Sequence, residues 1–205
     1  FARDGELVAV GSGLASRDFY FPLLIGKLRE RDYAKVLDIG CGDGEFLRVA
    51  CQGIPGMQGV GTDLCPDAVR AGNEHSKRVG MQDRIRLHAG DALKLRDHRS
   101  VLEGVNAATT FFVLHEFCGG DHQRAISFLR TFRETLPGIP FHVVETIRPT
   151  AKEMRAPPGP AIEYFLSHDL SNQRPVRRDT WHEIFRAAGY GNVEEDYTAF
   201  ARTSV

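Results

Sequence analysis

Three alternating glycines follow a short apolar segment near the start of the chain. Residues 36–39 have the character of a buried strand, and Gly40, Gly42 and Gly44 come directly after them. Glycine lets the backbone turn sharply and approach a ligand closely, because it has no Cβ atom. Such a loop between a strand and a helix is a common site for nucleotide-like ligands, but alone it is weak evidence.

Acidic residues accompany three successive apolar segments and narrow the choice of ligand. Asp38 lies just before the glycines, Asp63 follows the second segment, and Asp91 follows the third after Gly90. The carboxylate of Asp63 can accept hydrogen bonds from both ribose hydroxyls. Asp91 with Gly90 would suit an adenine amino group, and Asp38 the ammonium of a methionine moiety. Each acid alone is explained equally well by a turn or a helix cap, so only their joint placement indicates adenosine.

The order of the glycines favours S-adenosylmethionine (SAM) over a dinucleotide. In dehydrogenases the third glycine stands three residues after the second, but Glu45 occupies that position here. A negative side chain at the start of a helix disfavours a pyrophosphate, whereas SAM has no phosphate and carries a positive sulfonium. The predicted cofactor site consists of Asp38, Gly40, Gly42, Gly44, Asp63, Leu64, Gly90, Asp91 and Ala92.

A histidine follows the fourth apolar segment. If that segment is a strand of a parallel α/β sheet, its carboxyl end is where a substrate would lie. His115 can act as a general base or as a metal ligand, and a structural hydrogen bond is the alternative interpretation. The residues around it lack the Asn/Asp-Pro-Pro-aromatic motif of enzymes that methylate amino groups of DNA. A nucleic-acid base is therefore not the expected substrate.

Alternating strands and helices must position these residues. The expected strands are 36–39, 58–62, 85–88, 106–112 and 141–146, and the expected helices are 18–31, 45–51, 66–78, 121–136, 161–167 and 180–188. This alternation predicts an α/β fold with a mostly parallel, Rossmann-like sheet, helices on both faces, and ligands at the carboxyl ends of the strands. Residues 193–200 and 201–205 are expected to pair as a closing hairpin, which gives seven strands with the last one antiparallel.

The composition suits a globular domain of ordinary hydrophobicity. Of the 205 residues 42% are hydrophobic and 26% charged, and the net charge is −1, which gives no overall attraction to nucleic acid or anionic lipid. No apolar run reaches the roughly 18 residues needed to cross a bilayer. None of the four cysteines forms a Cys-x-x-Cys pair, so reduced thiols in a cytoplasmic protein are the simplest expectation.

These motifs, in this order, resemble those of class I SAM-dependent methyltransferases from about Lys35 to Phe200. The segments around His115 and 164–173 resemble, more narrowly, the bacterial α-keto acid C-methyltransferases that supply nonribosomal peptide (antibiotic) biosynthesis. That resemblance implies that His115 and His168 bind Fe(II) or another divalent metal. It also implies that a 2-oxo acid chelates the metal and is methylated on its β-carbon through an enolate.

Three further residues are candidates for the chemistry. Glu116 and Asp169 each follow a proposed metal ligand and could hold water, take the substrate proton or orient a histidine. Arg148 could pair with the substrate carboxylate. Helix caps and surface salt bridges account for these residues equally well. The segment from about residue 148 to residue 178 is interpreted as a lid-like insertion.

Two alternatives to the metal-dependent C-methyltransferase stay open. In the first, a metal-free O- or N-methyltransferase uses His115 as its base and His168 has no role. In the second, the chain is a SAM-binding module without catalysis. Residues 1–34 are expected to be a helical segment, a remnant of a larger N-terminal region, and 35–205 the methyltransferase domain. The expected partners are a small-molecule substrate and a second copy in a homodimer, with no nucleic acid and no membrane.

Overall fold

A computed structural model describes residues 16–155, 162–196 and 203–204 of the chain. These residues divide into two compact units. The N-terminal unit consists of described residues 16–111 and 133–143, and the C-terminal unit of 112–132, 144–155, 162–196 and 203–204.

Parallel strands form the centre of the N-terminal unit. They are β1 (Lys35–Ile39), β2 (Gln58–Asp63), β3 (Ile85–Ala89) and β4 (Ala107–Phe111), in the order β3-β2-β1-β4. The next strand, β5 (Phe141–Thr146), begins beside β4, where the amide of Ala108 donates to the carbonyl of Pro140. Strand β1 is buried almost throughout, as expected of a parallel strand covered on both faces. The predicted Rossmann-like α/β fold is therefore confirmed.

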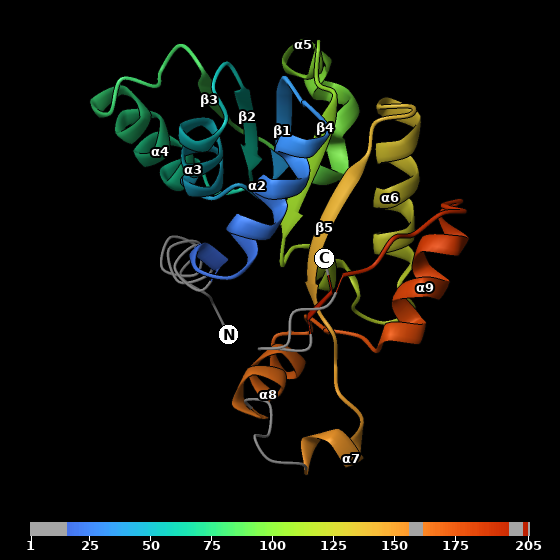
Figure 1. Ribbon diagram of the computed structural model, residues 1–205. Helices are drawn as coiled ribbons and strands as arrows, with labels where there is room; N and C mark the ends of the chain where they lie inside the picture. Colours follow the sequence, from blue (N-terminus) through green and yellow to red (C-terminus); the bar gives the residue numbers. More distant parts are fainter. Residues whose placement is uncertain (1–15, 156–161, 197–202, 205) are drawn as a thin grey trace. The chain divides into compact units, whose positions relative to one another are not determined.

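The first three described helices lie together beside β1–β3 (Figure 1). They are α2 (Tyr20–Glu30), α3 (Glu45–Gly53) and α4 (Pro66–Arg78). Arg84 donates to the carbonyl oxygens of Cys51, Ile54 and Met57, and so satisfies acceptors at and beyond the end of α3.

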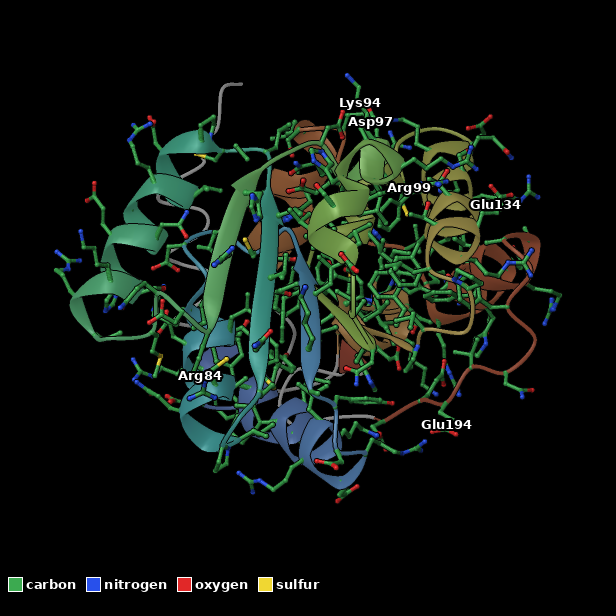
Figure 2. The ribbon with its side chains drawn as sticks, turned by 90° about the horizontal axis from the view of Figure 1, so that it is seen from above. Arg84, Lys94, Asp97, Arg99, Glu134 and Glu194 are labelled. Atoms are coloured by element: carbon green, nitrogen blue, oxygen red, sulfur yellow. The ribbon has the colours of Figure 1, made fainter. Side chains whose placement is uncertain are left out.

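A short helical segment that the sequence did not predict follows β3. It consists of the 3₁₀ helix η1 (Ala92–His98) and the helix α5 (Arg99–Leu102). Leu95 is buried, whereas Lys94 and Asp97 project outward (Figure 2). The buried Leu95 side chain thus anchors the helical segment that follows Asp91, the predicted adenine contact.

The C-terminal unit packs helices around the end of β5. It contains η2 (Leu114–Phe117), α6 (Gln123–Thr135, whose last three residues belong to the N-terminal unit), α7 (Ala151–Met154), α8 (Ile162–Leu170) and α9 (Arg178–Ala187). Its buried side chains include Phe128, Leu129, Phe132, Val144, Phe165, Trp181 and Ile184. The two-residue strand β6 (Thr203–Ser204) pairs antiparallel with Thr146 and Glu145 of β5.

The prediction of seven strands is wrong. The part of the chain that the structure describes forms five strands of five or six residues and the two-residue β6. Residues 193–196 form no strand, because three successive acids, Glu194–Asp196, give poor strand formers and no alternating apolar face. The rest of the expected hairpin, residues 197–202 and 205, lies outside the described residues. Within the described ranges, no helix is long and apolar enough to span a membrane.

Candidate active site

The glycine loop between β1 and α3 adopts a conformation that requires its glycines. Gly40, Gly42 and Gly44 have φ values of +72°, +54° and +76°, in the left-handed region. The carbonyl of Thr62, at the end of β2, accepts hydrogen bonds from the amides of Gly40 (2.8 Å) and Cys41 (3.1 Å). The loop is therefore fixed to the carboxyl end of β2.

Asp63 strengthens this attachment with its side chain. Its Oδ2 atom accepts from the Gly42 amide at 2.8 Å, and its Oδ1 atom accepts from the Cys65 amide at 2.8 Å. A carboxylate oxygen has more than one lone pair, so these bonds are compatible with additional ribose hydroxyls. Leu64, next to it, is 75% exposed and offers an apolar contact to an adenosyl group. The structure thus brings together the glycine loop and Asp63, as the sequence predicted, while their contacts with SAM stay a prediction.

Two residues that the sequence analysis missed hold the loop from its helix side. Gly72, in α4, faces the loop so closely that a Cβ atom there would lie 2.2 Å from the carbonyl oxygen of Asp43. Arg48, a buried residue of α3, donates to the Asp43 carboxylate at 2.7 Å and also to the Asp43 carbonyl oxygen. A glycine inside the predicted helix 66–78 was the available signal, because helix interiors disfavour glycine unless close packing requires it.

The predicted adenine contacts lie at the start of η1. Asp91 Oδ1 accepts from the Leu93 amide at 2.9 Å, which caps η1, and Ala92 is the first residue of that helix. The Gly90 amide donates to the carbonyl of Asp63 at 2.8 Å, and a Cβ at Gly90 would lie 2.7 Å from the Nε2 atom of His98. Asp91 therefore has the cap role that the sequence left open, and its contact with adenine stays a prediction.

Asp38 is a buried acid with a perturbed titration. Its side chain accepts from the Thr109 hydroxyl at 2.8 Å, and only 2% of the residue is exposed. Burial raises the pKa of Asp38 from 3.8 to about 7, the Thr109 hydrogen bond opposes the rise, and the charge of Asp63 adds to it. A cationic ligand group beside Asp38 would favour the ionised form.

We expect the affinity for S-adenosylhomocysteine (SAH) to rise by up to about tenfold per pH unit between about pH 5 and pH 7. The reason is that the ligand ammonium prefers ionised Asp38, whose pKa without ligand is about 7. Calorimetric titrations at several pH values should show this slope in the native chain and a flat profile in Asp38→Asn. The exposed Asp97→Asn variant is the matched control, and an equal slope in Asp38→Asn would contradict the assignment.

The same shift predicts a pH effect on folding. Because the folded pKa lies above the unfolded one, the native state holds a proton that the unfolded state releases between about pH 4 and pH 7. The free energy of unfolding therefore loses a contribution as the pH rises through this window. Asp38→Asn should remove that contribution, which chemical denaturation at both ends of the window can measure.

Two buried histidines meet in the C-terminal unit. His115 in η2 is 2% exposed and His168 in the last turn of α8 is 5% exposed, with ring centroids 5.0 Å apart at an interplanar angle of 63°. Backbone bonds fix both residues, because the Arg174 amide donates to the His115 carbonyl and the Gln173 amide to that of His168. The structure thus brings together the two residues that the sequence proposed as metal ligands.

Glu145, which the sequence analysis missed, orients His115. Its Oε2 atom lies 2.9 Å from His115 Nδ1 and accepts from the Thr146 amide at 3.1 Å, and its Oε1 atom accepts from the His115 amide at 3.2 Å. The carboxylate is buried, with 2% of the residue exposed. The signal in the sequence was a single acid directly after the apolar pair Val143 and Val144 in the predicted strand, because buried carboxylates require partners.

His168 is held in a comparable way. Its Nδ1 atom lies 2.6 Å from the carbonyl oxygen of Tyr164, and the Tyr164 ring contacts the imidazole with centroids 4.0 Å apart at an interplanar angle of 35°. In both histidines an oxygen thus engages Nδ1, the arrangement typical of imidazoles that bind a metal through Nε2. Within the described ranges no group of three or more His, Cys, Asp or Glu residues could hold a metal. Two imidazoles are donors that suit a divalent metal, and the metal itself stays a prediction.

The other candidate catalytic residues have structural contacts in the same unit. Arg148 pairs with the Asp169 carboxylate, donates to the Pro175 carbonyl at 2.9 Å and lies over the Phe165 ring. Glu116 is half-buried in η2. The Arg148–Asp169 pair therefore joins the segment after β5 to α8, whereas the catalytic roles of all three residues stay predictions.

Comparison with known proteins finds methyltransferases. The sequence profile of a family described as "Methyltransferase domain" matches residues 36–134. The chain is 31% identical over 194 residues to the 2-ketoarginine methyltransferase of Streptomyces arginensis. The matched region covers 91% of this chain and 55% of that protein.

Solved structures share the fold. The mitomycin 7-O-methyltransferase MmcR superimposes with a TM-score of 0.69 at 15% identity, covering 97% of this chain and 52% of that chain. PigF with bound SAH gives a TM-score of 0.72 at 21% identity, covering 96% and 57%. At these identities the likeness shows the fold alone, and the chain spans about half the length of these relatives.

Proposed function

Because the chain belongs to the class I SAM-dependent methyltransferases, we propose that it transfers the methyl group of SAM to the β-carbon of a 2-oxo acid. The metal-dependent methylation of a 2-oxo acid rests on one observation, the buried pair His115 and His168. The Nδ1 atom of each histidine is engaged by an oxygen. The relative from Streptomyces arginensis supports the substrate class, since its name gives a 2-oxo acid.

The proposed reaction begins with loss of a proton from the β-carbon. A divalent metal held by His115 and His168 would act as a Lewis acid on the C1 carboxylate and C2 carbonyl of the substrate. Glu116 or Asp169 would accept the proton, which leaves an electron pair on the enolate. The β-carbon then forms a bond to the methyl carbon while the bond from that carbon to sulfur breaks, giving SAH and a β-methylated 2-oxo acid.

In the cofactor half of this proposal the glycine loop, Asp63 and Leu64 hold the adenosyl group, and Asp38 attracts the methionine ammonium. These residues bind and orient SAM, which converts the encounter of two reactants into a positioned reaction. They require no residue of the C-terminal unit, so cofactor binding and metal binding can be measured separately.

An assay with labelled SAM and a panel of 2-oxo acids tests the proposal. We expect a product heavier by one methylene, with the new carbon at C3 by NMR, and loss of turnover in excess chelator with recovery on adding Fe(II). Full turnover in chelator would overturn the metal-dependent step. Transfer to no small acceptor, by protein that binds SAH, would instead favour a binding module without catalysis.

A metal-free O- or N-methyltransferase is the second candidate. The His115–Glu145 contact favours it, because an imidazole oriented by a buried carboxylate is also the arrangement of a general base. In that reaction His115 would take a proton from a hydroxyl or amine, and His168 would contribute packing only.

Glu145→Gln tests the orienting role of this carboxylate under either function. Both Glu145 oxygens accept hydrogen bonds, so an amide would turn an NH₂ group toward a donor. We expect kcat/KM to fall by about 10- to 100-fold, with SAH affinity unchanged. Glu134→Gln, which alters only an exposed pair with Arg96, is the control and should have native activity. Native kcat/KM in Glu145→Gln would count against the role.

A further inference from the structure

Tyr164 contacts His168 in two ways and reaches the end of β5 in a third. Its carbonyl oxygen accepts from His168 Nδ1, its ring lies against the imidazole in a tilted arrangement, and its hydroxyl lies 3.2 Å from the hydroxyl of Thr146. Thr146 is the residue next to Glu145, which orients His115. We propose that Tyr164 and Thr146 are positioning residues that set the ring of His168 relative to His115, an inference that rests on the proposed metal-binding function.

The contacts form one continuous path within the C-terminal unit. The Thr146 amide donates to Glu145 Oε2, and the same oxygen lies 2.9 Å from His115 Nδ1. Thr146 therefore connects through its backbone to one histidine and through its side chain and Tyr164 to the other. Two adjacent residues of β5 hold both proposed ligands, although the histidines are far apart in the sequence.

This arrangement addresses a specific problem of a site with two ligands. An imidazole rotates about two side-chain bonds, and only a narrow range of orientations aims both Nε2 atoms at one ion. The Tyr164 ring, 4.0 Å away between centroids, restricts rotation of the His168 ring, and such ring pairs contribute interaction energy beyond simple burial. The Thr146 contact restricts the Tyr164 ring in turn. Groups that hold metal-binding histidines in this way typically change metal affinity by 10- to 100-fold when removed.

Conservative variants separate the hydroxyl contact from the ring contact. Tyr164→Phe and Thr146→Val each remove the same hydroxyl–hydroxyl contact without removing the ring, and Tyr164→Leu removes the ring contact with His168 as well. We expect each of the first two to weaken Zn²⁺ binding by about tenfold, and Tyr164→Leu to weaken it by up to about 100-fold. The double variant Tyr164→Phe/Thr146→Val should lose no more than either single variant, because both act through one contact.

Zn²⁺ affinity is measured by competition with a chromophoric chelator, and Tyr190→Phe is the matched control. Tyr190 belongs to the same unit and donates its hydroxyl to the Leu129 carbonyl, so its variant loses a comparable hydrogen bond. It should bind Zn²⁺ as the native chain does. Additive losses in the double variant, or equal losses in Tyr190→Phe, would overturn the inference.

A second readout needs no metal. The side-chain ¹⁵N resonances of His168 in metal-free protein should shift in Tyr164→Phe and in Thr146→Val, whereas those of His182 should not. Unchanged His168 resonances and unchanged Zn²⁺ affinity in both variants would overturn the positioning role while leaving the proposed function intact. Native protein that binds no Zn²⁺ would overturn the metal-dependent function, and the resonances would then decide the positioning role alone.

Discussion

Replacing His168 by alanine is expected to abolish tight metal binding and to lower kcat by roughly 1,000-fold, with SAH affinity unchanged. The expected loss is large because His168 is one of two proposed protein ligands, and a Lewis acid supplies several kcal/mol of stabilisation to a developing enolate. SAH affinity should persist because the glycine loop is held by Thr62, Asp63 and Arg48, all in the N-terminal unit.

The matched control for this variant is His182→Ala. His182 is a partly exposed histidine of α9 that pairs with Glu195, and its loss should leave metal content and turnover at native values. Metal content by elemental analysis, single-turnover rates and calorimetry with SAH give the three readouts. If His168→Ala keeps native turnover while His115→Ala loses about 10²- to 10⁴-fold, a metal-free reaction with His115 as base replaces the metal-dependent one.

The cofactor half of the molecule could be predicted largely from the sequence. Val36, Leu37 and Ile39 are apolar, and the segment leads directly into glycines that need positive φ, so strand, loop and following helix are encoded within a few neighbouring residues. The closeness of Asp63 to the loop could also be predicted, because the carboxyl ends of adjacent parallel strands share one edge of a sheet.

The contacts around the two histidines could not be predicted in the same way. Glu145 stands 30 positions from His115, and its role depends on side chains meeting across η2 and β5. The contacts of Tyr164 have no signal in the sequence either, because an aromatic side chain at helical spacing is usually a packing residue. Arg148 and Asp169 were considered separately, although the structure pairs them. Long-range pairing of polar groups has no periodic signal, whereas strands and helices have one.

The predicted strand does not begin at residue 193 for a local reason. The acids at 194–196 interrupt the alternation of apolar and polar residues on which a strand depends. The short helices η1, η2 and α7 were missed because elements of four to seven residues are too short to show a period.

A second large effect is expected from adding a single methyl group at Gly72. In Gly72→Ala the new Cβ would lie 2.2 Å from the Asp43 carbonyl oxygen and 2.5 Å from Leu87 Cδ1. The Leu87 side chain can rotate, but the carbonyl belongs to the backbone of the glycine loop, so helix and loop must move apart. We expect the free energy of unfolding to fall by about 1–3 kcal/mol.

The same displacement should reach the cofactor site, because Asp43 lies between Gly42 and Gly44. A strain of about 1.4 kcal/mol that is relieved by moving the loop out of its binding conformation would weaken SAH binding about tenfold.

Gly26→Ala is the control, since Gly26 also lies within a helix, α2, and a Cβ there would have nothing within 4 Å. It should raise the free energy of unfolding by about 0.5–1 kcal/mol, because alanine loses less backbone entropy on folding, and leave SAH affinity unchanged. Opposite signs for the two variants in denaturant titrations would show that α4 acts on the loop through contact. Equal stabilisation by both would mean that Gly72 is an ordinary helix residue and that α4 does not set the position of the loop.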